Sequence, residues 1–212
     1  MKLIVSFTIY AALVAATSCS SVKYGDPNDE ETVNIDYGIT DRQRFAETMV
    51  NSLIESPALG YLQHPGKGDD LRIIVYMGGV ENRTLEHIDT QGITDSIKTA
   101  LLKSGRFRFV AGKQGQDEIG EQVRFQQGSG RVNPEMAKEF GKQLGADVVI
   151  YGTLRSIEKK RGRSFESGGV KTNRTDYQFV LQCDNIETGE TIWMDEKEIT
   201  KTSKTGLFGD NN

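Results

Sequence analysis

The sequence has few of the residues from which catalytic and metal sites are commonly built. It contains only two histidines and two cysteines among 212 residues. His64 and His87 are far apart, and neither belongs to a metal-binding spacing such as HExxH or a paired CxxC. A GxSxG elbow, an SxxK pair and the lysine and hydroxyl of a phosphate-binding loop are also missing. These absences predict a protein that is not an enzyme and that holds no metal and no cofactor.

A basic excess and long hydrophobic runs are missing as well. The chain has 26 Lys and Arg residues against 30 Asp and Glu residues, with a net charge of -4. No positive surplus therefore points to nucleic acid as a partner. After the N-terminus, no apolar run approaches the roughly 20 residues that a membrane-spanning helix needs.

The N-terminus has the features of an export signal. Lys2 precedes an apolar stretch over residues 3–16, which is too short to span a bilayer and fits the apolar region of a secretory signal. Residues 16–19, "ATSC", resemble a bacterial lipobox, in which small residues precede a lipidated cysteine. The resemblance implies cleavage between Ser18 and Cys19, with Cys19 as the lipid attachment point. The alternative is an ordinary signal peptide that is cut near Ser18 and leaves a free cysteine.

A lipidated Cys19 has consequences for location and for disulfides. The acyl chains would hold the protein stably on a membrane. Ser20 and Ser21 follow the cysteine without an Asp, which by similarity to enterobacterial sorting implies the outer membrane, with the domain facing the periplasm. Cys183 then has no disulfide partner, and its alternation with apolar residues predicts a buried position on one face of a strand.

The chain divides into five segments. We expect a lipoprotein signal peptide over 1–18, an acidic flexible tether over 19–39, a helix and loop over 40–70, a globular domain over 71–201, and a flexible tail over 202–212. The tether is expected because residues 20–36 are polar and acidic and show no apolar periodicity.

Hydrophobic periodicity predicts a mixed α/β fold. Helices are expected over 41–55, 89–104 and 114–126, and a further helix begins with Asn133 as its N-cap and Pro134 at its first position. Strands are expected over 71–77, 106–110 and 147–154, followed by a hairpin of 176–186 and 191–200. This order favours a mixed four- to five-stranded sheet sandwiched by helices. Residues 158–173 are basic and glycine-rich without a core pattern, and we expect a mobile hairpin loop there.

A polar stretch, "VENRTLEHIDT", follows the first predicted strand. Loops beyond the carboxyl ends of parallel strands are where α/β folds bind ligands. Arg83 in this stretch offers a guanidinium fork to an anionic group. The alternative is a structural turn whose polar side chains satisfy backbone groups.

Four stretches, in this order, resemble the LpoB family, the outer-membrane lipoprotein activators of penicillin-binding proteins. They are "ENRT", "TALLKSGRFRFV", "GKQLGADVVIYGTL" and "IETGETIWMDEKEI", and the resemblance covers roughly residues 71–200. Related domains occur in the N-terminal part of TolB and in the curli secretion lipoprotein CsgG. The resemblance therefore implies a TolB N-terminal-like fold.

The resemblance to the LpoB family implies a non-enzymatic role. A monomeric, lipid-anchored protein would bind a class A penicillin-binding protein, a bifunctional peptidoglycan synthase, and favour its active conformation. Our candidate docking residues are Arg131, Asn133, Pro134 and Lys138, with Arg83 as a second location; capping and solvated charge are the alternative roles for all five. The alternative function is a structural or transport accessory lipoprotein of TolB or CsgG type, which self-assembles or joins an envelope complex.

The predicted tether is short for this role. Family members from enteric bacteria carry a long proline-rich spacer after the lipidated cysteine, whereas about 20 residues separate Cys19 from the first predicted helix. Fully extended, these residues would reach at most about 66–72 Å. As a flexible coil they would average about 25 Å.

Overall fold

The computed structural model describes residues 25–31, 33–62, 69–131, 133, 135, 145–165 and 167–206. Ser18 and Cys19, with the whole predicted signal peptide, lie outside the described residues. So do Pro134 and Lys138 and most of the helix that was expected to follow Asn133.

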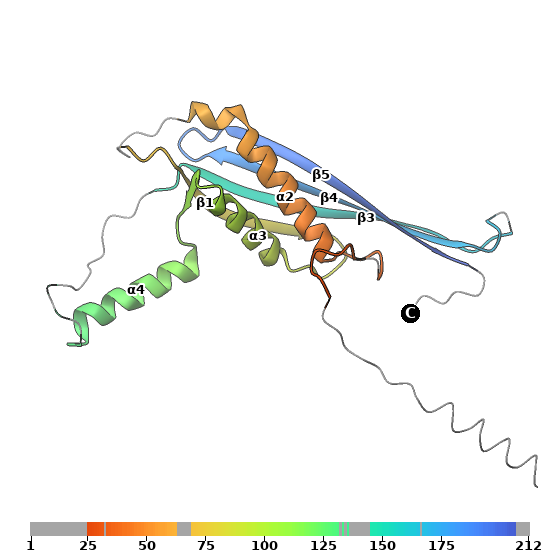
Figure 1. The fold of residues 1–212 in the computed structure, drawn as a ribbon, viewed down its shortest axis with the longest axis horizontal. Helices are drawn as coiled ribbons and strands as arrows, with labels where there is room; N and C mark the ends of the chain where they lie inside the picture. The colour runs from red at the N-terminus through yellow and green to blue at the C-terminus, as the bar shows by residue number, and fades with distance from the viewer. Residues whose placement is uncertain are drawn as a thin grey trace, which may run out of the picture.

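Five strands form one mixed sheet, which confirms the expected mixed α/β fold; among the described residues, however, helices cover one face of the sheet and do not sandwich it (Figure 1). The strands are β1 (Ile73–Arg83), β2 (Phe107–Phe109), β3 (Val148–Arg161), β4 (Lys171–Asn185) and β5 (Thr191–Thr205), in the spatial order β2-β1-β3-β4-β5. β1 is parallel to both β2 and β3, while β4 and β5 continue as an antiparallel meander. The parallel pairs need crossover connections, and helices supply them.

Three helices lie close to their predicted positions: α2 (Ile39–Glu55), α3 (Thr90–Lys103) and α4 (Lys113–Gly128). The short 3-10 helix η1 (Pro57–Tyr61), which follows α2, was not predicted. α2 and α3 contact each other and cover the same face of the sheet (Figure 1). α4 leads away from the sheet, its only buried residues are Gly120 and Val123, and its Ile119 and Phe125 side chains are exposed. None of the described helices combines the length and the hydrophobicity of a membrane-spanning segment.

The core lies between the sheet and the pair α2 and α3. On β4, alternate side chains from Tyr177 to Cys183 are buried, as period-2 patterning requires. They meet Phe45 on α2 and Ile97 on α3, and the Phe45 and Phe179 rings are 5.3 Å apart. Each fully buried aromatic or aliphatic side chain of this kind contributes about 1.5–3 kcal/mol. The predicted burial of Cys183 is confirmed.

α2 belongs to this core, although the sequence placed it ahead of the globular domain. Phe45, Met49 and Leu53 are fully buried and belong to the same cluster as the strand residues. The predicted loop between this helix and the first strand suggested that the helix lay outside the globular domain. Packing against β5 and α3 instead makes α2 part of that domain.

The chain before α2 also contacts the domain, in contrast to the solvated tether expected over 19–39. The Gln43 side chain donates a hydrogen bond to the carbonyl of Pro27 (3.2 Å), and the Thr40 hydroxyl accepts one from the backbone of Glu31 (2.9 Å). We define residues 35–38 as the strap. The buried carboxylate of Asp41 and the amine of Lys201 hold the strap against the sheet.

The strands extend farther than the periodicity predicted. β1 continues to Arg83, so residues 80–83 are strand and not loop. β3 and β4 pair as far as Arg161 and Thr172, and β5 pairs with β4 as far as Thr205. Residues 158–161, 171–173 and 202–205 are therefore strand, where a loop and a tail were expected. Thr205 is buried, but none of these residues adds an apolar side chain to the core, so backbone hydrogen bonds hold them without an apolar pattern.

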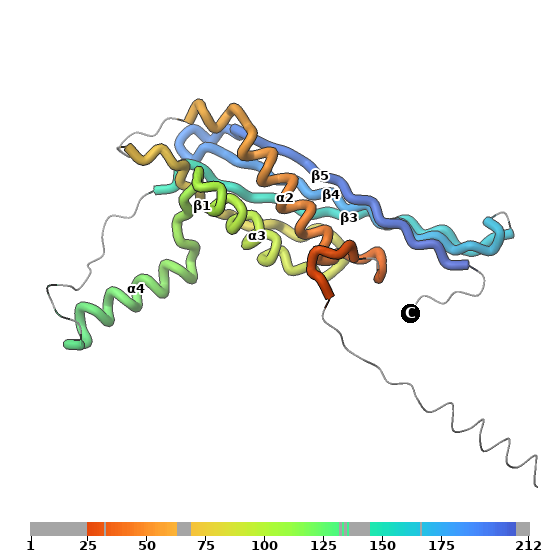
Figure 2. Tube along the Cα trace, in the orientation of Figure 1, coloured from red at the N-terminus to blue at the C-terminus, as the bar shows by residue number. Residues whose placement is uncertain are grey.

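This extension forms an arm, which we define as residues 158–161, 171–175 and 201–205 together with the turn that joins β3 to β4. Figure 2 shows the arm projecting from one end of the sheet, beyond the helices.

Candidate partner-binding surface

The two candidate docking locations from the sequence lie on different parts of the structure. Arg83 is the last residue of β1 and lies beside Arg155 of β3 in the register of the sheet. Arg131 and Asn133 follow the C-terminal end of α4, which leads away from the sheet, and both are exposed. The structure therefore does not bring Arg83 and Arg131 together.

Arg83 forms an ion pair with Glu81 on the same strand (2.8 Å). The hydrogen bond from the Arg83 guanidinium lowers the pKa of Glu81 and raises the pKa of Arg83. Both side chains are more than half exposed, so water screens this pair and the guanidinium remains accessible. Arg83 thus belongs to a surface and not to a buried site.

The polar stretch continues from the end of β1 into a structural turn that leads to α3. The Asn82 amide donates to the carbonyl of Glu86 (2.8 Å), and its oxygen accepts from the backbone and hydroxyl of Thr84 (2.9 and 2.8 Å). Asp89 caps α3 by accepting a hydrogen bond from Gly92. These side chains satisfy backbone groups, which is the alternative that the sequence left open.

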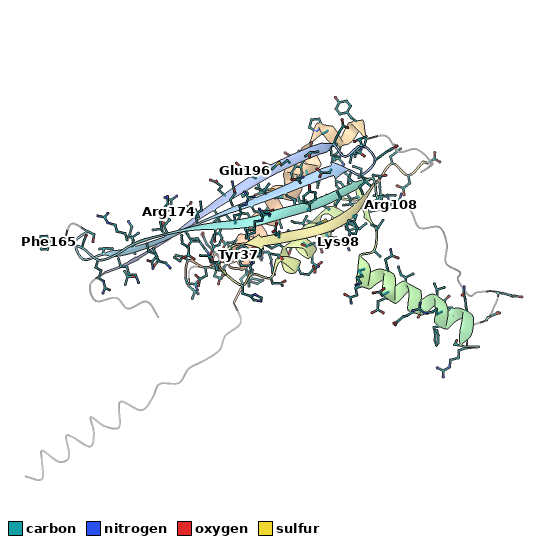
Figure 3. The ribbon with its side chains drawn as sticks, turned by 180° about the vertical axis from the view of Figure 1, so that it is seen from behind. Tyr37, Lys98, Arg108, Phe165, Arg174 and Glu196 are labelled. Atoms are coloured by element: carbon teal, nitrogen blue, oxygen red, sulfur yellow. The ribbon has the colours of Figure 1, made fainter. Side chains whose placement is uncertain are left out.

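The second face of the sheet has no described helix over it, and we call it the open sheet face. Figure 3 shows the molecule from this side, with the strands in front of α2 and α3 and with Glu196 of β5 in view. Alternation along the strands assigns its side chains, because neighbours of buried residues point the other way. They include Arg83, Tyr151, Arg155, Ile157, Asp176, Gln178, Asp184, Met194 and Glu196.

Polar side chains on the open sheet face are ordered by hydrogen bonds across the strands. The Tyr151 hydroxyl donates to Asp184 (2.7 Å) and also accepts a hydrogen bond from Gln182. The hydrogen bond to Asp184 raises the pKa of Tyr151. Gln178 donates to Glu196 (3.0 Å) on the neighbouring strand. These contacts fix the side chains before any partner binds, which lowers the entropy cost of binding.

Apolar side chains are also exposed on this face. Met194 and Ile157 are 60% and 62% exposed, and Tyr151 is exposed as well. Tyr, Met and Arg are enriched at protein–protein interfaces relative to other surfaces. With Arg83 and Arg155, the open sheet face has the composition of a protein-binding surface.

The described residues contain no group of three His, Cys, Asp or Glu side chains that could hold a metal ion. A hollow of about 650 Å³ lies between the middle of β1, α3 and the start of α4. Two of its charged lining residues already have partners, since Asp95 accepts from Gln91 (3.0 Å) and the Lys98 amine lies 5.6 Å from the Phe109 ring centre.

The strap crosses the end of the core at the start of α2. The Glu86 carboxylate accepts hydrogen bonds from the Tyr37 backbone (2.9 Å) and from the Tyr177 hydroxyl, which also donates to the carbonyl of Ile35 (3.3 Å). Burial, followed by the hydrogen bond to Glu86, raises the pKa of Tyr177. The Tyr37 ring lies 6.3 Å from Phe45 and 5.9 Å from Tyr177.

Lys201 of β5 holds both the strap and the start of α2 against the sheet. The Lys201 amine lies 2.7 Å from the buried Asp41 carboxylate and donates to the carbonyl of Asp36 (2.6 Å). Asp41 also accepts from the backbone of Gly38, which caps α2. The strap is therefore part of the folded domain, and its contacts fix the position at which the preceding chain joins the domain.

Comparison with known families gives a match over most of the chain. The family model described as "Peptidoglycan-synthase activator LpoB" matches residues 41–199. This range contains nearly all of α2, each described helix and strand from η1 to β4, and most of β5. Comparison with curated proteins gave no match.

Solved structures that this chain resembles include domains from this family. The LpoB C-terminal domain from Escherichia coli is 17% identical, with a TM-score of 0.40; the match covers 75% of this chain and 98% of that one. The corresponding domain from Salmonella enterica is 16% identical, with a TM-score of 0.37 and coverage of 74% and 94%. Lipoprotein GNA1162 from Neisseria meningitidis is 12% identical, with a TM-score of 0.37 and coverage of 62% and 84%.

Proposed function

Since the chain belongs to the LpoB family of peptidoglycan-synthase activators, we propose that it binds a class A penicillin-binding protein and activates it. The observation that carries this proposal is the family match, which spans the folded domain from α2 into β5. Activation by a binding protein needs no catalytic group of its own. It needs tighter binding to the active conformation of the synthase than to the inactive one.

The proposed docking surface is the open sheet face. Its exposed Met194, Ile157 and Tyr151 supply apolar contact area, and Arg83 and Arg155 supply guanidinium groups that can pair with carboxylates. The location first predicted from the sequence, Arg131 and Asn133 with Pro134 and Lys138, remains an alternative docking surface.

The proposed anchor is a lipid on Cys19, in the outer membrane and facing the periplasm. Among the described residues, contacts with α2 begin at Pro27, so the chain is held on the domain by the eighth position after Cys19. Fully extended, about eight residues reach at most about 26–29 Å. This is less than half the reach expected of the whole tether. The domain would therefore stay near its membrane, and the synthase would have to extend toward it.

Affinity capture from the host envelope tests this proposal. The bait is the chain from residue 19 with Cys19→Ser, which retains every buried residue from Asp41 to Thr205. It is incubated with detergent-solubilised envelopes, and retained proteins are identified by mass spectrometry. We expect a class A penicillin-binding protein.

Matched baits locate the docking surface. A Met194→Glu, Arg155→Glu bait should lose the synthase, whereas a Lys113→Glu bait, altered at the start of α4, should retain it. Loss with Arg131→Glu alone would place docking after α4. Retention of only the protein itself, or of a secretion component, would overturn the activator proposal.

A further inference from the structure

We propose that the arm binds an anionic phospholipid surface, with Phe165 at its tip entering the interfacial region. This inference concerns a different part of the molecule from the open sheet face and does not depend on which synthase is bound.

The arm is strongly basic in an acidic chain. The segments 158–175 and 201–205 contain eight Lys and Arg residues against two Glu residues. This is a surplus of six positive charges in a chain of net charge -4, so the remainder carries -10. Such a separation of charge turns one end of a molecule toward an anionic surface.

Some of the cations have partners within the protein. Lys160 pairs with Glu158 (3.0 Å), Arg174 pairs with Asp176 (2.7 Å), and Lys201 holds the strap through Asp41. These three cations are therefore explained by contacts within the fold.

Other cations have no such explanation. Among the described residues, Arg161, Lys171 and Lys204 have no carboxylate within ion-pair distance, and all three are exposed. Arg161, Thr172 and Lys204 lie side by side across the three strands. Lys159 lies directly opposite Arg174, two positions along the strands from the Arg161 and Thr172 pair and closer to the core. Asp176 interacts with both cations and offsets part of their repulsion, and a bound anionic surface would offset more of it.

Phe165 gives the tip a second, apolar feature. Its side chain is fully exposed, at 103% of its reference area, and Figure 3 shows it at the outer end of the arm. The turn that carries it is ordered by hydrogen bonds from Gly168 and Gly169 to the carbonyls of Phe165 and Ser164. Both glycines have positive φ (61° and 76°), which other residues rarely adopt.

The arm has an aromatic residue at its tip and a group of cations behind it. This arrangement suits an anionic bilayer better than it suits an anionic polymer. Aromatic rings prefer the boundary between headgroups and acyl chains, and Lys and Arg residues just above it attract anionic headgroups. A polymer of carboxylates would satisfy the cations but would give Phe165 no apolar environment. The tip therefore distinguishes between these two sources of anionic charge.

Vesicle sedimentation tests the proposal. The chain from residue 19 with Cys19→Ser is mixed with vesicles of phosphatidylethanolamine containing 30% phosphatidylglycerol, which is roughly an anionic bacterial composition, and with vesicles of phosphatidylcholine alone. We expect binding to the anionic vesicles only, weakened by salt because exposed charges are screened. Each cation near such a surface strengthens association roughly fivefold.

Charge-matched variants identify the contact. Reversing Lys159, Arg161 and Lys204 to Glu should weaken partitioning by at least about twentyfold. Reversing Lys103, Lys113 and Arg124 on α3 and α4 gives the same net charge and should change it by less than about threefold. Phe165→Ala, which removes no buried contact, should weaken binding roughly three- to tenfold.

Two results would overturn the proposal. Equal losses in the two triple variants would do so, since only net charge would then matter. Binding to isolated cell wall but not to vesicles would also do so, in favour of an anionic polymer.

Discussion

Gly152 lies where β3 and β4 approach each other closely, on the core face beside Leu181. A Cβ atom at this position would lie 2.6 Å from the carbonyl oxygen of Val180 and 3.0 Å from a methyl group of Leu181. The backbone oxygen cannot rotate away as a side chain could. The sequence showed only a glycine within an apolar strand; the paired strand, some thirty residues later, gives the reason for it.

We predict that Gly152→Ala destabilises the fold by about 1–3 kcal/mol, because overpacking displaces the β4 backbone. Urea unfolding followed by circular dichroism measures the change. Gly60→Ala is the matched control, since no atom lies within 4 Å of the position that its methyl group would take and its backbone is not left-handed. Equal stability of Gly152→Ala and wild type would contradict the close approach.

Cys183 shows the effect of burial on a single side chain. Removal from water, with a smaller contribution from the charge of Asp184, raises the pKa of its thiol to about 12. A raised pKa keeps the thiol protonated and unreactive through neutral and mildly alkaline pH. In a Cys19→Ser chain we predict no labelling by a thiol reagent at about pH 8, below this raised pKa, until guanidinium unfolds the protein. Rapid labelling of the folded chain would show that the thiol on β4 is not buried.

At the scale of elements, helices were predictable and strand ends were not. α2, α3 and α4 each carry apolar residues at helical spacing, so their limits were predicted to within about two residues. The arm adds no apolar side chain to the core, and its strands are held mainly by backbone pairing, so no apolar pattern marks where they end. The strap depends on Glu86 and Lys201, which are distant in sequence, and no local pattern indicates such contacts.

The ion pair beside the strap, between Asp41 of α2 and Lys201 of β5, should stabilise the fold. We predict that Asp41→Ala destabilises the domain by about 3 kcal/mol, because it removes the α2 cap and leaves the Lys201 amine without its carboxylate. Denaturant unfolding measures this. Glu30→Ala, which breaks the exposed pair with Arg44, should have no measurable effect. If the two variants were equally stable, the ion pair would not hold the strap.

At the scale of the whole molecule, the sequence indicated the family and the mixed sheet but not which surface is free. Met194 and Tyr151 alternate with buried residues along their strands. The sequence pattern alone would therefore also fit a sheet with helices on both faces. Only the position of α2 and α3 on the same side leaves these two side chains exposed. The arm and the open sheet face then give the molecule two separate surfaces, one proposed for lipid and one for a protein partner.

The most direct measurement is the rate of glycan polymerisation by the captured synthase, titrated with the chain and its variants. We predict that wild type and Lys113→Glu stimulate the rate equally. The Met194→Glu, Arg155→Glu chain should need at least about tenfold more protein for half-maximal effect, which corresponds to about 1.4 kcal/mol of lost binding. Thermal unfolding of each variant verifies that the fold is intact. Full stimulation by a folded Met194→Glu, Arg155→Glu chain would contradict docking through the open sheet face, and no stimulation by wild type would contradict the activator role itself.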